Sequence, residues 1–213
     1  RKTRRREPMS ATKMNGAESL VRTLIDGGIE VCFTNPGTSE MHFCAALDRV
    51  PGLRCVLGLF EGVVTGAADG YGRMRDFPSA TLVHTGPGLG NGLANLHNAR
   101  KARSPVVNIV GEHATYHIRH DAPLTSDIEG IAAPVSDWVK TSRNAEDVST
   151  DGAQAIAEAR KTPGRIATLI LPADTAWNEA SSGATVPSVP NPETVNSNAL
   201  DECVRVLRSG EPV

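Results

Sequence analysis

Two polar side chains stand where catalytic groups of α/β proteins are found. Glu61 follows the apolar, strand-like run 53–60 and opens a helix-like segment, and His84 ends the apolar run that begins at Ser79. Ligand sites of open α/β sheets lie at the carboxyl ends of the strands, so both side chains are candidates for acid–base chemistry. Two plainer interpretations stay open: Glu61 as a carboxylate that stabilises a helix N-terminus, and His84 as a hydrogen-bonded histidine at the sheet edge.

The helix-like segment after Glu61 carries an unusual number of glycines. Gly62, Gly66 and Gly70 recur at four-residue intervals and so form a ridge on one helix face, with Gly72 just beyond. Each costs roughly 0.5 to 1 kcal/mol of helix stability relative to alanine. We expect compensation from the close approach of a second helix, a ligand or another subunit.

A second glycine-rich segment, residues 86–92, follows the strand-like run that ends at His84. The order of strand, glycine loop and helix is similar to a dinucleotide-binding loop. However, Asn91 replaces the third glycine of that pattern, and Pro87 removes a backbone N–H that would hold a phosphate. A nucleotide-binding domain is therefore the weaker alternative.

Residues 112–136 lack clean periodicity and are expected to form a long polar loop. His113, His117 and His120 lie in it with loosely metal-like spacing, but no further ligand cluster accompanies them. We therefore predict no metal site in this chain.

The elements that position these residues alternate along the chain. A capping box at Asn15 and Glu18 begins an amphipathic helix. Such alternation predicts an α/β fold, a doubly wound parallel sheet with helices on both faces. The strand-like runs are 30–34, 53–59, 79–84, 105–110 and 165–171, and helix-like segments include 40–50, 93–102 and 149–161.

The chain divides into four parts by composition. Residues 1–13 are basic and are predicted to be a disordered tail, and residues 14–180 form the α/β domain. Residues 181–198 are rich in Pro, Ser, Asn and Thr, as linkers are. Residues 199–213 contain an amphipathic helix that cannot bury its own apolar face, so we expect them to begin a further, truncated domain.

Composition narrows the possible partners and the compartment. A formal net charge of −2 and an aromatic content of 4% argue against a nucleic-acid partner. No apolar run approaches the length of a membrane span, so we expect a cytoplasmic protein without a membrane partner. The four cysteines lack Cys-x-x-Cys spacing, and we expect reduced, buried thiols at Cys32, Cys44 and Cys55.

Residues 35–40, 59–73 and 85–91 together resemble the acetolactate synthase and benzoylformate decarboxylase branch of the thiamine-diphosphate enzymes. Their order, spacing and strand–loop context all agree with that family, and the block around Glu61 is the most specific part. The resemblance covers about residues 15–177. It implies that residues 14–180 are the N-terminal, pyrimidine-binding domain of such an enzyme.

The resemblance also implies roles for individual residues. Glu61 matches the glutamate that activates the aminopyrimidine ring of thiamine diphosphate, and His84 matches an active-site histidine of the decarboxylases. Thr38 matches a residue that contacts the substrate carboxylate, whereas Glu112 stands where the synthases usually carry glutamine. Further cofactor contacts are expected from Pro36, Gly37, Gly86, Pro87, Gly88 and Asn91.

The implied function is decarboxylation of a 2-keto acid, followed by aldehyde release or by carboligation to a second keto acid. In this family a C-terminal domain holds magnesium and the diphosphate, and residues 1–213 do not include it, so the chain alone is expected to be inactive. A homodimer, or docking on a full-length relative, is expected because family sites form between subunits. The alternative is a non-catalytic partner that dimerises through the ridge of Gly62, Gly66 and Gly70.

Overall fold

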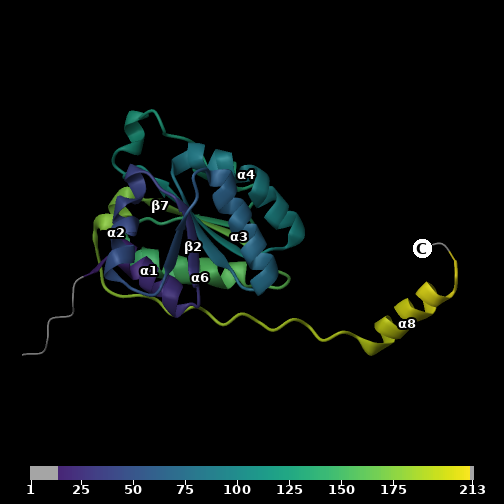
Figure 1. The fold of residues 1–213 in the computed structure, drawn as a ribbon. Helices are drawn as coiled ribbons and strands as arrows, with labels where there is room; N and C mark the ends of the chain where they lie inside the picture. Colours follow the sequence, from purple (N-terminus) through teal and green to yellow (C-terminus); the bar gives the residue numbers. More distant parts are fainter. Residues whose placement is uncertain (1–13, 212–213) are drawn as a thin grey trace, which may run out of the picture.

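The computed structural model of the protein describes residues 14–211, and the predicted basic tail at 1–13 lies outside that range. Six strands form one sheet in the order β3-β2-β4-β5-β7-β6, and every neighbouring pair is parallel (Figure 1). The predicted parallel α/β sheet is therefore confirmed. The strands are β2 (Val31–Asn35), β3 (Arg54–Leu57), β4 (Ser79–Val83), β5 (Val106–Glu112), β6 (Trp138–Thr141) and β7 (Ile166–Pro172).

Helices cover both faces of the sheet, as the doubly wound prediction requires. One face buries α1 (Gly16–Asp26), α2 (Met41–Arg49), α6 (Ala145–Ala159) and α7 (Ala173–Trp177). The other face buries α3 (Glu61–Arg75), α4 (Thr85–Ala102) and α5 (Ile128–Ala132). The smaller elements are β1 (Met14–Asn15), which pairs with β8 (Glu179–Ala180), and the 3-10 turns η1 (Thr38–Glu40) and η2 (Ile118–His120).

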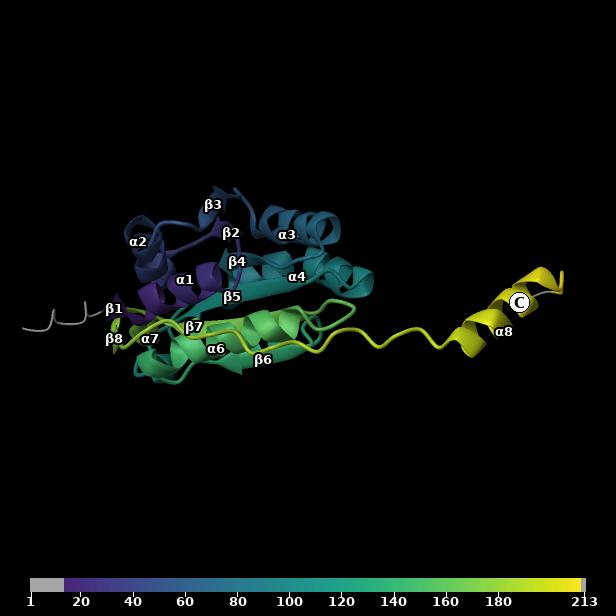
Figure 2. The same ribbon diagram turned by 90° about the horizontal axis from the view of Figure 1, so that it is seen from below.

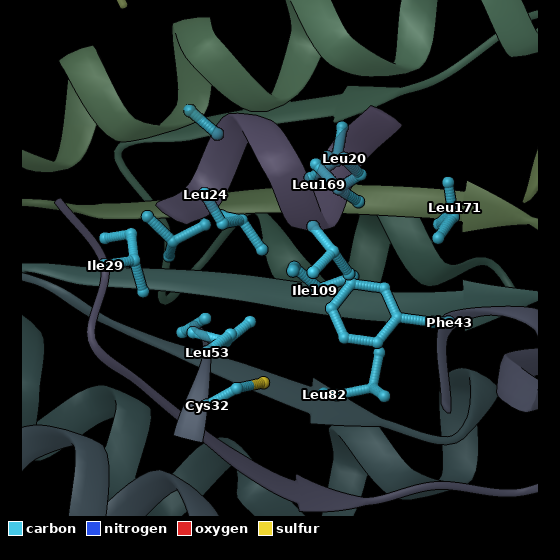
Figure 3. Packing of buried hydrophobic residues seen from close by; sticks show 14 of the residues in the cluster. Leu20, Leu24, Ile29, Cys32, Phe43, Leu53, Leu82, Ile109, Leu169 and Leu171 are labelled. Atoms are coloured by element: carbon cyan, nitrogen blue, oxygen red, sulfur yellow. The ribbon is translucent and has the colours of Figure 1, made fainter. Parts of the chain in front are cut away.

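The two hydrophobic clusters arise from the alternation of side chains along the central strands. In β5, Val107 and Ile109 belong to one cluster, whereas Val106 and Val110 belong to the other. Figure 3 shows the first cluster, in which Leu20 and Leu24 of α1 and Phe43 of α2 lie close to Ile109 and Leu169. Both faces of the central strands are thus dry, as expected for a parallel sheet.

A buried row of polar side chains crosses the three central strands. Thr81, Asn108 and Thr168 stand side by side in register and are fully buried. Thr81 Oγ1 donates to Asn108 Oδ1 at 2.7 Å, and Asn108 Nδ2 donates to Thr168 Oγ1 at 3.0 Å. A slip between β4 and β5 or between β5 and β7 would break a bond of the buried Asn108 amide, so the row favours one register of these three strands.

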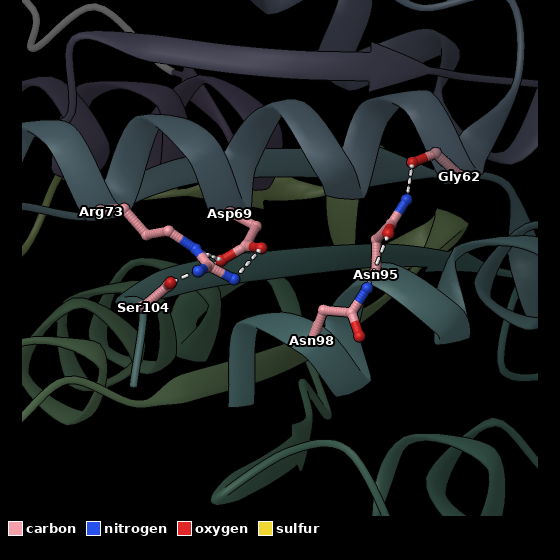
Figure 4. A network of polar contacts seen from close by, with 6 residues as sticks. All are labelled: Gly62, Asp69, Arg73, Asn95, Asn98 and Ser104. Atoms are coloured by element: carbon pink, nitrogen blue, oxygen red, sulfur yellow. Dashed lines mark hydrogen bonds and ion pairs between the residues drawn. The ribbon is translucent and has the colours of Figure 1, made fainter. Parts of the chain in front are cut away.

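Helices α3 and α4 lie side by side and are joined through small residues and amides (Figure 4). Asn95 Nδ2 donates to the Gly62 carbonyl at 2.7 Å, and Thr65 Oγ1 donates to the Gly92 carbonyl at 3.0 Å. A Cβ at Gly66 would come within 2.9 Å of the Asn95 amide. Of the predicted ridge glycines, Gly66 therefore allows the close contact between α3 and α4, and Gly62 contributes its carbonyl to it.

The far end of α3 is tied down by a buried carboxylate. Asp69 accepts two hydrogen bonds from Arg73 and one from Ser104, which lies just before β5 (Figure 4). Nearby, a Cβ at Gly72 would meet the Pro105 carbonyl at 2.9 Å, whereas a Cβ at Gly70 would meet nothing within 4 Å. Gly70 is thus the one member of the predicted ridge that faces open space.

The glycine-rich segment 86–92 is helical, so the predicted loop is wrong. Helix α4 begins at Thr85, directly after β4, and Pro87 occupies its first turn, where a backbone N–H is not needed. The glycines instead allow close contacts, such as that between Gly92 and Thr65. A dinucleotide loop of the predicted kind is therefore not formed.

Three other expectations need correction. Strand β3 is an edge strand that is shorter and more exposed than predicted, and Cys55 in it is exposed rather than buried. Cys44 in α2 is only partly buried, whereas Cys32 is buried as predicted. Segment 112–136 is only partly a loop, since β5 reaches Glu112 and the segment contains η2 and α5. Strand β6 was not predicted, because four residues give too short a pattern.

The C-terminal segment begins on the body of the domain and then leaves it. Ala184 N–H donates to Thr23 Oγ1 at 3.0 Å, and Val186 packs on the first hydrophobic cluster. Helix α8 (Ser197–Arg208) has no buried residue, and Figures 1 and 2 show it well apart from the sheet. An amphipathic helix is therefore present where the sequence predicted one.

The glycines of α3 give a matched pair of variants. Gly72→Ala is expected to lower the free energy of unfolding by about 1–3 kcal/mol, because the methyl group would overlap the Pro105 carbonyl. Gly70→Ala is expected to raise it by about 0.5–1 kcal/mol through helix propensity alone. Urea unfolding of both variants provides the measurement, and equal shifts would contradict the packing described for α3.

Candidate active site

The predicted site residues gather where the strand order reverses. From β2 the chain moves outward to β3 and then returns to β4 on the other side of β2. Thr38 follows β2, Glu61 follows β3, and His84 follows β4. Crevices at such switch points, outside the carboxyl ends of the strands, are the usual ligand sites of doubly wound sheets.

His84 is held by a carboxylate that the sequence analysis did not single out. The His84 Nδ1 atom lies 2.8 Å from Glu40 Oε2, and the same oxygen accepts the Gly37 N–H at 2.6 Å. The Glu40 side chain is fully buried, whereas that of His84 is 22% exposed. Gly37 allows this arrangement, since a Cβ there would lie 2.5 Å from the imidazole ring.

Burial raises the pKa of the Glu40 carboxyl, and the Gly37 N–H and the adjacent His84 ring oppose that rise. The second oxygen, Oε1, is buried without a hydrogen-bond partner and lies against Gly111 in β5. Only a residue without a side chain leaves room for it at position 111. Glu40 is therefore enclosed by backbone from two strand ends.

A sharp turn between β4 and α4 presents His84. Thr85 has φ of 50°, a left-handed conformation that is unfavourable for a β-branched residue. It is also fully buried, and its hydroxyl has no partner among the described residues. Such strain persists where the surrounding structure imposes it, and it often marks functional sites.

Glu61 begins α3 and is positioned from both sides. Asn35 Nδ2 donates to the Gly58 carbonyl at 2.7 Å, which ties the end of β2 to the segment that leads into α3. Asn91 Nδ2 of α4 donates to Glu61 Oε2 at 3.0 Å. The other oxygen, Oε1, faces Gly88 and makes no hydrogen bond within residues 14–211.

Thr38 is exposed at the rim of a small pocket of about 200 Å³. The pocket is walled by rings from the segment after β5 and from α7: His113, Tyr116, His117 and Trp177. His113 and His117 stack edge to face with their ring centroids 5.7 Å apart. Thr38 thus places an exposed hydroxyl group next to a largely aromatic wall.

Glu112 ends β5 as a buried carboxyl group. Burial raises its pKa, while the His113 N–H, which donates to Oε1 at 2.6 Å, and the His113 ring oppose the rise. This position at the carboxyl edge of the sheet follows from the register, because Glu112 lies beyond the residues of β5 that pair with β4. Glu40, Glu61 and Glu112 thus place three carboxyl groups at this edge, near the His84 imidazole.

The structure brings the predicted residues together in two contacting sets. Gly37 and His84 meet at Glu40, and Glu61 meets Gly88 and Asn91 on the first turns of α4. The Gly88 N–H donates to the His84 carbonyl at 2.9 Å, which joins the two sets. The remaining predicted residues lie beside these sets in the sequence: Pro36, Thr38, Gly86, which faces Ser126, and Pro87.

The described residues offer little support for a functional site elsewhere in the domain. A larger pocket, of about 640 Å³, lies at β6 and α6 and contains none of the predicted site residues. In the part of the chain that the structure describes, no group of three or more His, Cys, Asp or Glu side chains could hold a metal ion. No helix of residues 14–211 is long and apolar enough to cross a membrane.

The fold and the site define a class: a doubly wound domain with acid–base side chains at its topological switch point. The chain belongs to the family described as "Thiamine pyrophosphate enzyme, N-terminal TPP binding domain", whose model matches residues 14–131. The predicted family and its cofactor, thiamine diphosphate, are thereby confirmed.

Relatives agree with this assignment. The chain is 57% identical over 199 residues to a protein of Mycobacterium tuberculosis that is named "Putative acetolactate synthase large subunit IlvX". It is 32% identical over 157 residues to benzoylformate decarboxylase of Pseudomonas aeruginosa, covering 73% of this chain and 29% of that enzyme.

The 4-hydroxybenzoylformate decarboxylase of Rhodococcus jostii RHA1 has a similar structure, with a TM-score of 0.79 and 28% identity over 92% of this chain. The chain spans 38% of the length of that decarboxylase and, with 93% of its own residues aligned, 38% of IlvX. These relatives therefore contain much more than the domain described above.

The raised pKa of Glu112 predicts a dependence of stability on pH. A carboxyl group whose folded pKa exceeds its unfolded pKa stabilises the fold at acidic pH, and this contribution is lost as the pH rises through the folded value. Glu112→Gln keeps an acceptor for the His113 N–H without a charge. The variant is expected to melt at a higher temperature than the wild type at about pH 8, and to lose this advantage towards about pH 4.

Thermal melts across that pH range provide the measurement. Glu211→Gln, at an exposed position, serves as the control and is expected to follow the wild type. A Glu112→Gln variant that is less stable than the wild type at every pH would contradict the prediction.

Proposed function

We propose that this chain is the pyrimidine-binding part of a thiamine-diphosphate enzyme that decarboxylates 2-keto acids. The observation that carries the proposal is the Glu61 carboxylate, which is fixed through Oε2 and leaves Oε1 without a hydrogen bond in residues 14–211. An oxygen held in this way suits a hydrogen bond to a ring nitrogen of an aminopyrimidine. The bare backbone of Gly88 leaves room for a flat ring beside it.

When bound, thiamine diphosphate supplies a nucleophilic carbon and an electron sink that allows the substrate carboxylate to leave as carbon dioxide. Glu61 would hold the pyrimidine ring and exchange a proton with its nitrogen. Asn91 would keep the carboxylate oriented for that exchange. Pro36, Gly37, Gly86, Pro87 and Gly88 lie on the two turns at the sheet edge, after β2 and after β4, and we assign further cofactor contacts to them there.

His84 and Thr38 are the side chains that we assign to the substrate. The imidazole can donate or accept a proton near neutral pH, and the Thr38 hydroxyl can bind a carboxylate oxygen. The aromatic wall beside Thr38 favours a keto acid with a sizeable apolar group. The histidine at position 84 and the glutamate at position 112 support decarboxylation with aldehyde release over carboligation.

The surface beside Glu61 supports a partner subunit. Leu57, Leu59, Phe60 and Val63 are at least half exposed and follow one another from β3 into α3, with Leu59 91% exposed. An apolar patch of this kind is typical of a protein–protein interface. We propose that it is covered in a homodimer, and that a full-length relative could dock there instead if the chain is a non-catalytic partner.

We further place the protein in the cytoplasm. Its four cysteines, all within the described residues, are free thiols, as is usual in a reducing compartment. A 2-keto acid of central metabolism would be available there as substrate.

Replacing Glu61 tests the catalytic assignment. In the gene product that contains this chain, Glu61→Gln is expected to lower the rate of carbon dioxide release from a 2-keto acid by about 100-fold or more, because an amide cannot exchange the proton. The control, Glu193→Gln, lies in the exposed C-terminal segment and is expected to keep the wild-type rate. Unchanged turnover in Glu61→Gln would refute the assignment.

Reading the coding sequence past Val213 separates the enzyme from its alternative. An in-frame Gly-Asp-Gly, followed a couple of dozen residues later by asparagine, would support an enzyme that also binds magnesium and diphosphate. A stop codon directly after Val213 would favour the non-catalytic partner.

The proposed interface is tested by a charge in the apolar patch. Val63→Glu is expected to weaken self-association by about tenfold or more, because burying an unpaired carboxylate is unfavourable. Val195→Glu, at an exposed valine of the extended segment, is the matched control. Analytical ultracentrifugation measures both variants, and a wild-type chain that stays monomeric at high concentration would argue against the interface.

A further inference from the structure

We propose that Glu40 is a positioning residue that holds His84 in one tautomer, with the proton on Nδ1, and joins His84 to the turn that carries Thr38. The inference rests on the proposed function in so far as His84 and Thr38 meet the substrate. It concerns this chain's own side chains and requires no bound cofactor to be tested.

One carboxylate oxygen makes both contacts. Glu40 Oε2 lies 2.6 Å from the Gly37 nitrogen and 2.8 Å from His84 Nδ1. The Gly37 N–H can only donate, and its short distance is that of a bond to a charged or carbonyl-type oxygen. An oxygen of that type carries no hydrogen of its own, so Nδ1 supplies the hydrogen of the second contact.

The surroundings leave this arrangement little freedom. The Glu40 side chain is fully buried, and its Oε1 atom lies against Gly111, where a Cβ would clash with it. On the other side the imidazole ring lies against Gly37, where a Cβ would be 2.5 Å from Cγ and Nδ1. The ring therefore cannot rotate away from Glu40 without moving the turn itself.

The consequence is a defined role for the other ring nitrogen. With the proton on Nδ1, the Nε2 atom of a neutral imidazole is an acceptor. Among residues 14–211 no side chain or backbone group bonds to Nε2, and the ring is partly exposed. Nε2 is thus the atom free to meet a substrate, and Glu40 fixes its direction.

The same oxygen couples two substrate residues. Gly37 directly precedes Thr38, so the bond from its N–H places the start of η1 relative to His84. Any shift of the turn after β2 would shift the imidazole at the end of β4. The distance between the hydroxyl and the imidazole is therefore set by Glu40 rather than by either strand alone.

The test is the tautomer of His84 in the 213-residue chain, measured by nitrogen NMR of the histidine side chains without cofactor or substrate. Spectra are recorded at about pH 8, where an ordinary imidazole is neutral. The His84 signals are identified among those of the six histidines by their loss in His84→Asn. The wild type is expected to show the Nδ1–H tautomer in at least about tenfold excess.

Three variants distinguish positioning from general structural support. Glu40→Gln keeps an acceptor oxygen and is expected to retain the Nδ1–H excess, whereas Glu40→Met removes the acceptor and is expected to abolish it. Gly37→Ala leaves Glu40 intact but displaces the ring, so it is also expected to abolish the excess. Gly90→Ala, where a Cβ meets nothing within 4 Å, is the control and should match the wild type.

The proposal is overturned if wild-type His84 carries its proton on Nε2, or if both Glu40→Met and Gly37→Ala keep the wild-type ratio. Should Glu40→Met not fold, Gly37→Ala and the wild-type spectrum decide. Because these spectra involve no turnover, failure of the proposed enzymatic function would appear only in the Glu61→Gln assay and leave this result intact.

Discussion

The buried row of Thr81, Asn108 and Thr168 is the interaction on which the rest of the domain depends. It favours one register of the three central strands, because Asn108 is bonded to both Thr81 and Thr168 only in that alignment. A fixed register sets where the carboxyl end of each of these strands lies along the same edge of the sheet. At that edge Gly111 of β5 lies against the side chain of Glu40, which follows β2.

Glycines allow the close contacts that hold the side chains of the site in place. Gly37, Gly88 and Gly111 lie where side chains of the site approach the backbone, and Gly66 lies where α4 meets α3. The cost in helix propensity along α3 is offset by a contact that sets the distance from Glu61 to Asn91. Gly70, which faces open space, gains nothing of this kind within the chain.

Much of the fold could be predicted from local patterns, because parallel strands buried on both faces are continuous apolar runs and the capping box at Asn15 marks a helix start. The parts that could not be predicted depend on distant residues. Strand β6 forms only against β7, and in the helical segment 86–92 three glycines pack against distant side chains: Ser126, Glu61 and Thr65. Glu40 follows a polar turn in the sequence, and nothing in the local pattern indicates that it is buried. It becomes buried beside His84 only when β2 and β4 come together in the folded domain.

The left-handed turn at Thr85 has a consequence for how this chain can change. A glycine at position 85 would relieve an unfavourable backbone conformation and remove a buried hydroxyl that lacks a partner in the described residues. It would also give the neighbouring histidine more conformational freedom. Selection for thermostability would therefore favour glycine at position 85, whereas selection for a fixed His84 side chain would favour threonine. Screens for more stable variants would find improvements at this position that screens for higher activity would reject.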